Sequence, residues 1–270
     1  MTNALKINGA TRLYMILGDP IAQVRSPEVF TEQFAVAGMN AVLVPVRVPT
    51  ARFDEVIPGL MALGNLDGLL VTVPFKARMA RFASRLGPVA ACIGAVNALR
   101  READGSWSGD MFDGAGFVRG AERKGERIVG RQVLLFGAGG AGSAIACALV
   151  GAGVRSIRIV DPDAARTQAL ADALHKAFPG SDVAAAGSSQ GDYDMVVNAT
   201  PVGMRPDDGM PGDIATLAPG TLVGDVVISE SPTALIRFAR QHGCNWVNGR
   251  DMHGGQLDAL MAFFAGGASA

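Results

Sequence analysis

Charged residues are scarce in this chain of 270 residues, at 18% against the ~25% usual in soluble domains. The 24 lysines and arginines nearly balance the 25 aspartates and glutamates, so the formal net charge is −1. A nucleic-acid-binding surface needs a basic excess, which this composition does not supply. Disorder is also excluded, because 49% of the residues are hydrophobic and a disordered chain has little apolar surface to bury.

Cysteine is rare as well, and Cys92, Cys147 and Cys244 stand far apart. Their odd number and wide spacing favour reduced thiols in a core over disulfides or a redox pair. No cluster of histidine, cysteine or carboxylate residues has metal-ligand spacing, so we expect no metal. The segment 1–15 has no long apolar stretch and no small-residue cleavage site, which argues against a signal peptide and favours a cytoplasmic location.

One long segment, residues 133–154, contains no charge at all. Its length suits a membrane span, but six of its residues are glycine. A segment that begins with strand-forming residues, breaks at glycines and resumes with Ser143–Leu149 is better interpreted as strand, turn and buried helix. We therefore expect no membrane partner. Glycine is abundant throughout, with 35 residues, roughly double the usual share.

Short apolar runs alternate with amphipathic stretches in the first half of the chain. Ser26 is the expected N-cap of one helix, with Pro27 at its first position. A turn at Asp104-Gly105 is expected to join two antiparallel strands. The expected strands are Arg12–Leu17, Ala41–Val46, Gly68–Val73, Ala95–Arg100 and Trp107–Gly109, and the expected helices are Pro27–Ala37 and Ala51–Leu63.

The same alternation resumes in the second half, after a helix-like stretch from Asp113 to Glu122. The expected strands are Arg131–Phe136, Ser156–Val160, Asp182–Ala186, Met195–Asn198 and Leu222–Val227, and the expected helices are Ala141–Val150, Ala164–Phe178 and Pro232–His242. A last helix near Gln256–Phe264 is expected after a glycine-containing loop, Asn248–Gly255. Strands separated by helices predict an α/β fold with mainly parallel sheets, in two units that join near residues 100–115.

The glycine-rich turn fits a dinucleotide-binding motif. Residues 137–142 read Gly-Ala-Gly-Gly-Ala-Gly, after an expected strand and at the start of an expected helix. In the pattern G-x-G-x-x-G, Gly137 permits a tight turn, Gly139 lets the backbone approach a pyrophosphate, and Gly142 lets the helix pack closely on the strand. The N–H groups and the dipole of the helix start attract phosphate.

An acidic residue at the end of the next strand supports this interpretation. The Asp161 carboxylate can accept hydrogen bonds from the 2′-hydroxyl of an adenosine ribose, and it would repel a 2′-phosphate. No arginine follows at once, because the next residues are Pro162 and Asp163. The sequence therefore favours NAD as cofactor, with NADP as the alternative. It leaves open that Asp161 only caps the helix beginning at Ala164.

A further loop follows the strand Met195–Asn198 and reads Asn-Ala-Thr-Pro-Val-Gly-Met over residues 198–204. In a doubly wound sheet it borders the crevice at the carboxyl ends of the strands, where a nicotinamide would lie. The Thr-Pro turn also has a purely structural interpretation.

Several segments together resemble the shikimate/quinate dehydrogenase family, and they lie in order along nearly the whole chain. The most specific are Val-Thr-Val-Pro-Phe-Lys at 71–76 and Gly-Ala-Val-Asn at 94–97. The others are Gly18–Ile21, Ser26-Pro27, Gly109–Gly114, the glycine turn, the loop 198–204, and Gly249–Gln256.

The resemblance implies a substrate domain over residues 1–108, completed by a C-terminal helix over 250–270, and a Rossmann NAD(P)-binding domain over 109–249. It implies reversible hydride transfer between a nicotinamide and a ring hydroxyl of a cyclic polyol carboxylate, either shikimate, quinate or a close analogue. The expected oligomeric state is a monomer or a homodimer.

The resemblance also implies a catalytic pair, Lys76 and Asp113. Oxidising an alcohol by hydride transfer requires removal of the hydroxyl proton, and a partly desolvated lysine can move it. Asp113 would hold the lysine and the reacting hydroxyl in hydrogen-bonding geometry. Without the resemblance, Lys76 would be interpreted as a surface lysine and Asp113 as a helix cap.

The remaining contacts fall into two sets. The substrate contacts implied are Ser26, Thr72, Asn97 and Gln256. The cofactor contacts expected are Gly137, Ala138, Gly139, Gly140, Ala141, Gly142, Asp161, Thr200, Val202, Val226 and Gly249. His253 lies close in sequence to Gln256, and an orienting or structural role is favoured over a catalytic one.

The sequence departs from the family pattern where substrate and cofactor would bind. The family's two-serine motif H-S-x-S-P is Gln-Val-Arg-Ser-Pro over 23–27, so Val24 replaces a hydroxyl, a loss of ~1.5–3 kcal/mol if that hydroxyl bonds a charged group. The usual Tyr-Asn is Ile228-Ser229, and the cofactor motif Asn-Arg-Thr/Ser is replaced at Asp161–Asp163. These changes favour the same chemistry with NAD and an altered substrate preference. The alternatives are an enzyme for a substituted, for example amino, shikimate analogue, and a non-catalytic metabolite- or nucleotide-binding regulator.

Overall fold

The computed structural model describes residues 7–205 and 207–266, which form two compact units. Unit 1 consists of the chain up to Met111 and from Ala259 onward, and unit 2 is Phe112–Asp258. The sequence places the join at 108/109, whereas the compact units divide after Met111. Within the described ranges, no helix combines the length and apolar character needed to cross a membrane.

Unit 1 contains a mixed six-stranded sheet of order β2-β1-β3-β5-β6-β4. Its elements are β1 (Arg12–Gly18), α1 (Ser26–Val36), β2 (Ala41–Arg47), the 3-10 turn η1 (Thr50–Arg52), α2 (Phe53–Met61), β3 (Leu66–Val71), α3 (Lys76–Met79), the 3-10 turn η2 (Ala80–Phe82), β4 (Arg85–Leu86), α4 (Pro88–Ile93), β5 (Ala98–Arg101) and β6 (Trp107–Asp110). β1 is parallel to β2 and β3, while β5 pairs antiparallel with β3 and β6. The expected hairpin is present, with Gly105 at φ +82° in its turn.

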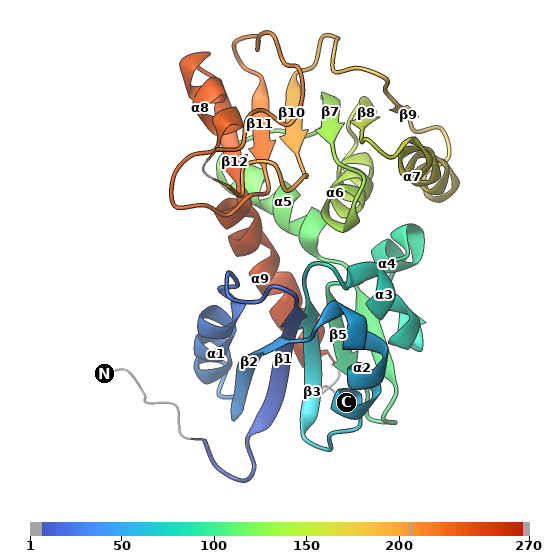
Figure 1. Ribbon diagram of the computed structural model, residues 1–270, viewed down its shortest axis with the longest axis vertical. Coiled ribbons are helices and arrows are strands. Elements are labelled where there is room, and N and C mark those ends of the chain that lie inside the picture. Colours follow the sequence, from blue (N-terminus) through green and yellow to red (C-terminus); the bar gives the residue numbers. More distant parts are fainter. Residues whose placement is uncertain (1–6, 206, 267–270) are drawn as a thin grey trace. The chain divides into compact units, whose positions relative to one another are not determined.

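Unit 2 contains a fully parallel six-stranded sheet of order β12-β11-β10-β7-β8-β9, seen in Figure 1 with α6 and α7 beside it. Its elements are α5 (Asp113–Arg123), β7 (Gln132–Phe136), α6 (Gly140–Gly151), β8 (Ser156–Val160), α7 (Ala164–Ala177), β9 (Val183–Ala185), β10 (Met195–Asn198), β11 (Leu222–Asp225), α8 (Ala234–Gln241), β12 (Asn245–Asn248) and the first part of α9 (Gly249–Ala265). The arrangement is the 3-2-1-4-5-6 order of dinucleotide-binding folds, and its switch point lies between β7 and β10.

Three local expectations are wrong. α1 begins at Ser26 itself with Arg25 in the N-cap position, so Ser26 is not the N-cap. β5 begins at Ala98 rather than Ala95, because residues 94–97 end the turn after α4. The stretch Asn248–Gly255 is not a loop, since α9 already begins at Gly249.

Packing against α5 explains why the glycine-containing stretch 249–255 is helical. A Cβ at Gly116 of α5 would lie 2.6 Å from the Met252 carbonyl oxygen, and a Cβ at Gly120 would lie 2.7 Å from that of Asp251. Gly255 faces the Gly116 backbone in the same way. Glycines on both helices thus allow α5 and α9 to approach closely, and this contact outweighs the low helix propensity of glycine.

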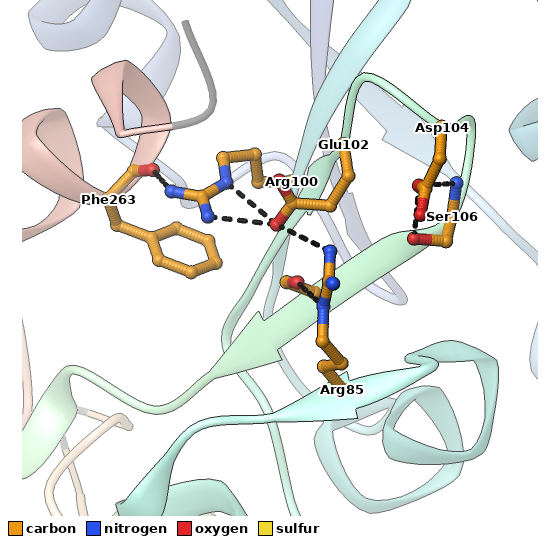
Figure 2. Close-up of polar contacts among 7 residues, drawn as sticks. Arg85, Arg100, Glu102, Asp104, Ser106 and Phe263 are labelled. Carbon is orange, nitrogen blue, oxygen red and sulfur yellow. Dashed lines mark hydrogen bonds and ion pairs between the residues drawn. The ribbon is translucent and has the colours of Figure 1, made fainter. Parts of the chain in front are cut away.

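The end of α9 completes the core of unit 1. The Phe264 ring lies 5.0 Å from the Tyr14 ring and 6.2 Å from the Phe30 ring, between centroids. Arg100 donates from Nη1 to the Phe263 carbonyl oxygen at 2.5 Å and pairs with Glu102 at 2.8 Å, as Figure 2 shows. The last helix is therefore held to β1 and α1 by aromatic contacts and to β5 by the charge-assisted hydrogen bond from Arg100.

Candidate active site

The glycine turn between β7 and α6 has the geometry that a dinucleotide-binding turn requires. Gly137 has φ +96°, in the region that favours glycine. A Cβ at Gly142 would collide with the Gly137 carbonyl oxygen, whereas a Cβ at Gly139 would point into open space. Gly139 is the N-cap of α6, so the first turn from Gly140 onward presents N–H groups without partners inside the helix.

Asp161 closes this turn from the neighbouring strand. Its side chain is 8% exposed, and its carboxylate accepts hydrogen bonds from Ala138 N at 2.8 Å and from Asp163 N at 2.9 Å. The cap of α7 is Asp163, which accepts from Arg166 N at 3.0 Å, so the interpretation of Asp161 as the helix cap is wrong. Each carboxylate oxygen of Asp161 retains a second lone pair for a ligand.

An exposed arginine lies beside these two carboxylates. Arg166 is 54% exposed, and its guanidinium is 3.7 Å from Asp161 Oδ1 and 3.3 Å from Asp163 Oδ2. Arg166 lies several residues after Asp161, whereas the family motif has its arginine directly after the first residue, so the motif does not indicate Arg166. The segment after β8 therefore carries two carboxylates, and the first turn of α7 places a cation beside them.

The loop after β10 is held by side-chain hydrogen bonds of its first residue. Asn198 donates from Nδ2 to the Val202 carbonyl oxygen at 2.9 Å and accepts at Oδ1 from Thr200 N at 3.0 Å and Thr200 Oγ1 at 2.6 Å. Thr200 Oγ1 in turn accepts from Val202 N at 3.1 Å. The Thr-Pro turn is thus shaped by a closed local network.

The predicted cofactor residues converge at the carboxyl edge of the unit 2 sheet. A Cβ at Gly137 would lie 3.1 Å from Thr200 Cγ2, which brings the glycine turn against the loop after β10. Val226 N donates to the Asn198 carbonyl oxygen at 3.0 Å. A Cβ at Gly249 would lie 2.4 Å from the Val226 carbonyl oxygen, so only glycine allows this close approach. The two loops and the start of α9 therefore share one edge.

A buried carboxylate that sequence reasoning missed lies behind this edge. Asp225, the last residue of β11, is 1% exposed and accepts hydrogen bonds from Asn198, Val227 and Thr233. Burial raises the pKa of Asp225, and these three hydrogen bonds act in the opposite direction. A single aspartate after a short strand fits no motif, so no sequence pattern indicates it.

In unit 1, Thr72 and Asn97 lie next to neighbouring strands, Thr72 just after β3 and Asn97 just before the antiparallel β5. Thr72 follows β3, and its N–H donates to the Leu17 carbonyl oxygen of β1 at 2.9 Å. Asn97 is 5% exposed and lies opposite β3, since its carbonyl accepts from Val71 N at 2.8 Å. Ser26 is buried at the start of α1, which follows β1.

Lys76 is half-buried at the start of α3, and its carbonyl oxygen accepts from Val96 N at 3.0 Å. This bond ties the start of α3 to the Gly-Ala-Val-Asn segment that contains Asn97. Asp113 is buried at the start of α5 in unit 2. The pairing of Lys76 with Asp113 stays a prediction.

The crossing of α5 and α9 brings the predicted site residues of unit 2 near one another. A Cβ at Gly116, one turn after Asp113, would lie 2.7 Å from the Gln256 Cβ. Burial lowers the pKa of His253, and the nearby Asp113 carboxylate partly opposes this effect. His253 is therefore a neighbour of Asp113, which the sequence alone did not indicate.

Comparisons with known proteins match both units. Residues 16–99 match the family model described as the shikimate dehydrogenase substrate binding domain, and residues 117–185 match the ThiF family. The shikimate dehydrogenase (NADP(+)) of Rubrobacter xylanophilus is 38% identical over 254 residues, which are 92% of this chain and 88% of that protein.

Two solved structures extend the likeness to the whole fold. The shikimate 5-dehydrogenase of Listeria monocytogenes, in complex with shikimate and NAD, has a TM-score of 0.86 at 28% identity and covers 97% of this chain and 94% of that chain. The quinate dehydrogenase of Corynebacterium glutamicum, in complex with NAD, has a TM-score of 0.85 at 30% identity and covers 95% and 94%.

Proposed function

The chain belongs to the shikimate dehydrogenase family, and on that premise we propose that it is an oxidoreductase acting on shikimate, quinate or a close analogue. The reaction is reversible hydride transfer between a nicotinamide dinucleotide and a ring hydroxyl. The observation that carries the proposal is the glycine turn at the switch point of the unit 2 sheet, where Gly137 and Gly142 are sterically required. The comparisons favour this enzyme over the non-catalytic regulator.

The proposed chemistry divides between the cofactor and the chain. When bound, the nicotinamide accepts or returns the hydride. Lys76 takes the hydroxyl proton as the alcohol is oxidised and returns it in the opposite direction. Asp113 orients the Lys76 amine and the hydroxyl, and its burial supports this role because a buried carboxylate is held in one position.

Four polar side chains are candidates for substrate recognition. We propose that Thr72, Asn97 and Gln256 bind ring hydroxyls and that Ser26 binds the carboxylate. Val24 cannot replace the serine hydroxyl of the family motif, and Ile228, which is 48% exposed, cannot replace the phenol. A substituted, for example amino, shikimate analogue is therefore the second candidate.

We propose NAD as the preferred cofactor, with NADP as the alternative. Asp161 and Asp163 support NAD, because two carboxylates at the end of β8 repel a 2′-phosphate. The curated relatives are named as NADP(+) enzymes, which gives the NAD preference no support, and Arg166 supplies a cation for the alternative. A cytoplasmic location and a monomeric or homodimeric state stay proposals from the sequence.

Steady-state assays with shikimate and quinate, each with NAD and NADP, test the proposal through the absorbance of the reduced nicotinamide. We expect turnover of at least one acid and a higher kcat/KM with NAD. No turnover of any cyclohexane or cyclohexene carboxylate would contradict the proposed function. A higher kcat/KM with NADP would contradict only the cofactor preference.

A further inference from the structure

We propose that Asp225 is a positioning residue that holds the two loops on the nicotinamide side of unit 2 in one fixed arrangement. The inference rests on the proposed function, because it takes the loop 199–203 and the segment after β11 as the walls of the nicotinamide site. Asp225 touches neither substrate nor cofactor in this proposal. It acts through the main chain and side chains that it binds.

The carboxylate of Asp225 divides its hydrogen bonds between its two oxygens. Oδ1 accepts from Asn198 Nδ2 at 3.1 Å and from Val227 N at 3.1 Å. Oδ2 accepts from Thr233 Oγ1 at 2.6 Å. All four residues are buried, so each donor loses a partner that water cannot easily replace if the carboxylate is removed.

The three donors come from three different segments. Asn198 ends β10 and fixes the loop 199–203 through Val202 and Thr200. Val227 belongs to the segment after β11, next to the predicted cofactor residue Val226. Thr233 is the N-cap of α8 and also accepts from Ile236 N at 3.3 Å.

The two oxygens therefore have separable tasks. Oδ1 joins the two predicted cofactor loops, because it binds one group from each. Oδ2 joins the same carboxyl to the start of α8. Cooperative networks of this kind fix geometry closely when every member is satisfied. A shift of either loop would displace the predicted contacts Thr200, Val202 and Val226 together.

The substitution Asp225→Asn distinguishes the role of Oδ1 from that of Oδ2. The single acceptor oxygen of the asparagine must face Asn198 and Val227, since both are donors, and its NH2 group then faces Thr233 Oγ1, which can also accept. Asp225→Asn thus retains the link between the loops. Asp225→Leu has a similar size and retains neither task.

The experiment compares Asp225→Leu, Asp225→Asn and wild type in kcat, in the KM for nucleotide and acid, and in the Kd for reduced nucleotide measured by its fluorescence. We expect Asp225→Leu to lower kcat and raise the nucleotide KM by about tenfold each, with the KM for the acid little changed. Asp225→Asn is expected to remain within about threefold of wild type.

Leu174→Ala is the matched control for lost stability. Leu174 is a fully buried residue of α7, a helix packed on β9 at the opposite edge of the unit 2 sheet. We expect it to lower the melting temperature without changing kcat or nucleotide KM of the folded enzyme. If Leu174→Ala reproduces the kinetic losses of Asp225→Leu at a matched melting temperature, Asp225 is merely structural and the inference is overturned.

Asn198→Ala provides a second route if Asp225→Leu does not fold. It breaks the same link from the other loop, so it should reproduce the loss in kcat and nucleotide binding. Wild-type kinetics and Kd in Asn198→Ala or in folded Asp225→Leu would overturn the inference. If wild type converts none of the cyclic acids, the proposed function fails, and the Kd ratio between wild type and these variants still decides the role of Asp225.

Discussion

The two units join the segments that carry their predicted site residues by different means. In unit 1 main-chain hydrogen bonds do so, as between Thr72 and Leu17 or between Val71 and Asn97. In unit 2 the main-chain bond from Val226 N to the Asn198 carbonyl oxygen is supplemented by a buried side chain, because the Asp225 carboxylate accepts from both Asn198 Nδ2 and Val227 N. Main-chain hydrogen bonds can persist when a side chain is changed, whereas a hydrogen bond made by a side chain is lost when that residue is substituted.

In unit 1 the side chains with a proposed chemical role differ from the groups that hold their segments, whereas in unit 2 some side chains hold the segments. In unit 1, the main-chain bond from Val96 N to the Lys76 carbonyl does not require the Lys76 side chain. In unit 2, we expect a substitution such as Asp225→Leu to remove bonds to two separate segments. Five variants, besides their controls, test the contrast, in order of decreasing expected effect.

Lys76→Ala should reduce kcat by ~10²–10⁴-fold, because the proton of the reacting hydroxyl loses its acceptor. The melting temperature should stay unchanged, since the Lys76 carbonyl still accepts from Val96. Steady-state kinetics and thermal unfolding measure the two quantities. Arg78→Ala on the same helix α3 is the control, because Arg78 pairs with Asp54 at 2.9 Å and should not affect kcat. Wild-type kcat in Lys76→Ala contradicts its catalytic role.

Gly142→Ala and Gly139→Ala form a matched pair in the glycine turn of unit 2. The first adds a Cβ against the Gly137 carbonyl oxygen and the second adds one in open space. We expect Gly142→Ala to lose about 1–3 kcal/mol of unfolding free energy. Gly139→Ala should keep wild-type stability and weaken nucleotide binding by about tenfold, because its methyl group would occupy the approach of the pyrophosphate.

Denaturant unfolding and nucleotide titration distinguish the two glycine variants. If Gly139→Ala binds nucleotide as wild type does, the pyrophosphate does not pass that glycine. If Gly142→Ala is as stable as wild type, the close contact of α6 with the turn is not required.

Arg166→Ala should change the ratio of kcat/KM for NADP to that for NAD. The guanidinium is the cation beside Asp161 and Asp163, so its loss should lower NADP use about fivefold to tenfold and leave NAD use unchanged. Arg237→Ala, at an exposed position on α8, is the control. An unchanged cofactor ratio would show that Arg166 does not meet the 2′-position.

His253→Gln should weaken the dependence of stability on acidic pH. Burial lowers the pKa of His253 from its ordinary 6.5, so the unfolded chain binds more protons than the folded chain just below pH 6.5. The stability that depends on neutral His253 is complete above about pH 6.5 and is lost as the pH falls from that value through the lower pKa of the folded chain. Unfolding at about pH 7.5 and 5.5 checks it, and an equal loss in variant and wild type rules out His253 as the source.

The sequence predicts unit 2 better than unit 1, for a physical reason. Parallel strands buried on both faces are continuous apolar runs between helices, so β7, β8 and β10 are evident from composition. Unit 1 adds the short β4 and the helices α3 and α4, which are too brief for any periodicity to appear. In α9, helix formation over the glycines depends on contact with Gly116 and Gly120 of α5, which no local pattern encodes.

The candidate site shows the same limit. Spacing alone predicts the tight turn at Gly137 and the close packing at Gly142, which the structure has, whereas the approach of a pyrophosphate to Gly139 stays a prediction. Asp225 and Arg166 were not found, because their partners are brought near only by the fold. A motif identifies residues whose partners are close to them in sequence. Residues whose partners are far away in sequence are identified only from the folded structure.

The path of α9 has a consequence for how the chain folds as it is synthesised. Unit 2 is continuous in sequence, so its sheet does not need the segment that begins at Ala259. The N-terminal part of unit 1 is synthesised first but lacks Phe264 against Tyr14 and Phe30, and the Phe263 carbonyl bound by Arg100, until that later segment has been made. N-terminal regions usually fold first during synthesis. Here unit 1, which contains the N-terminal region, completes its core after unit 2.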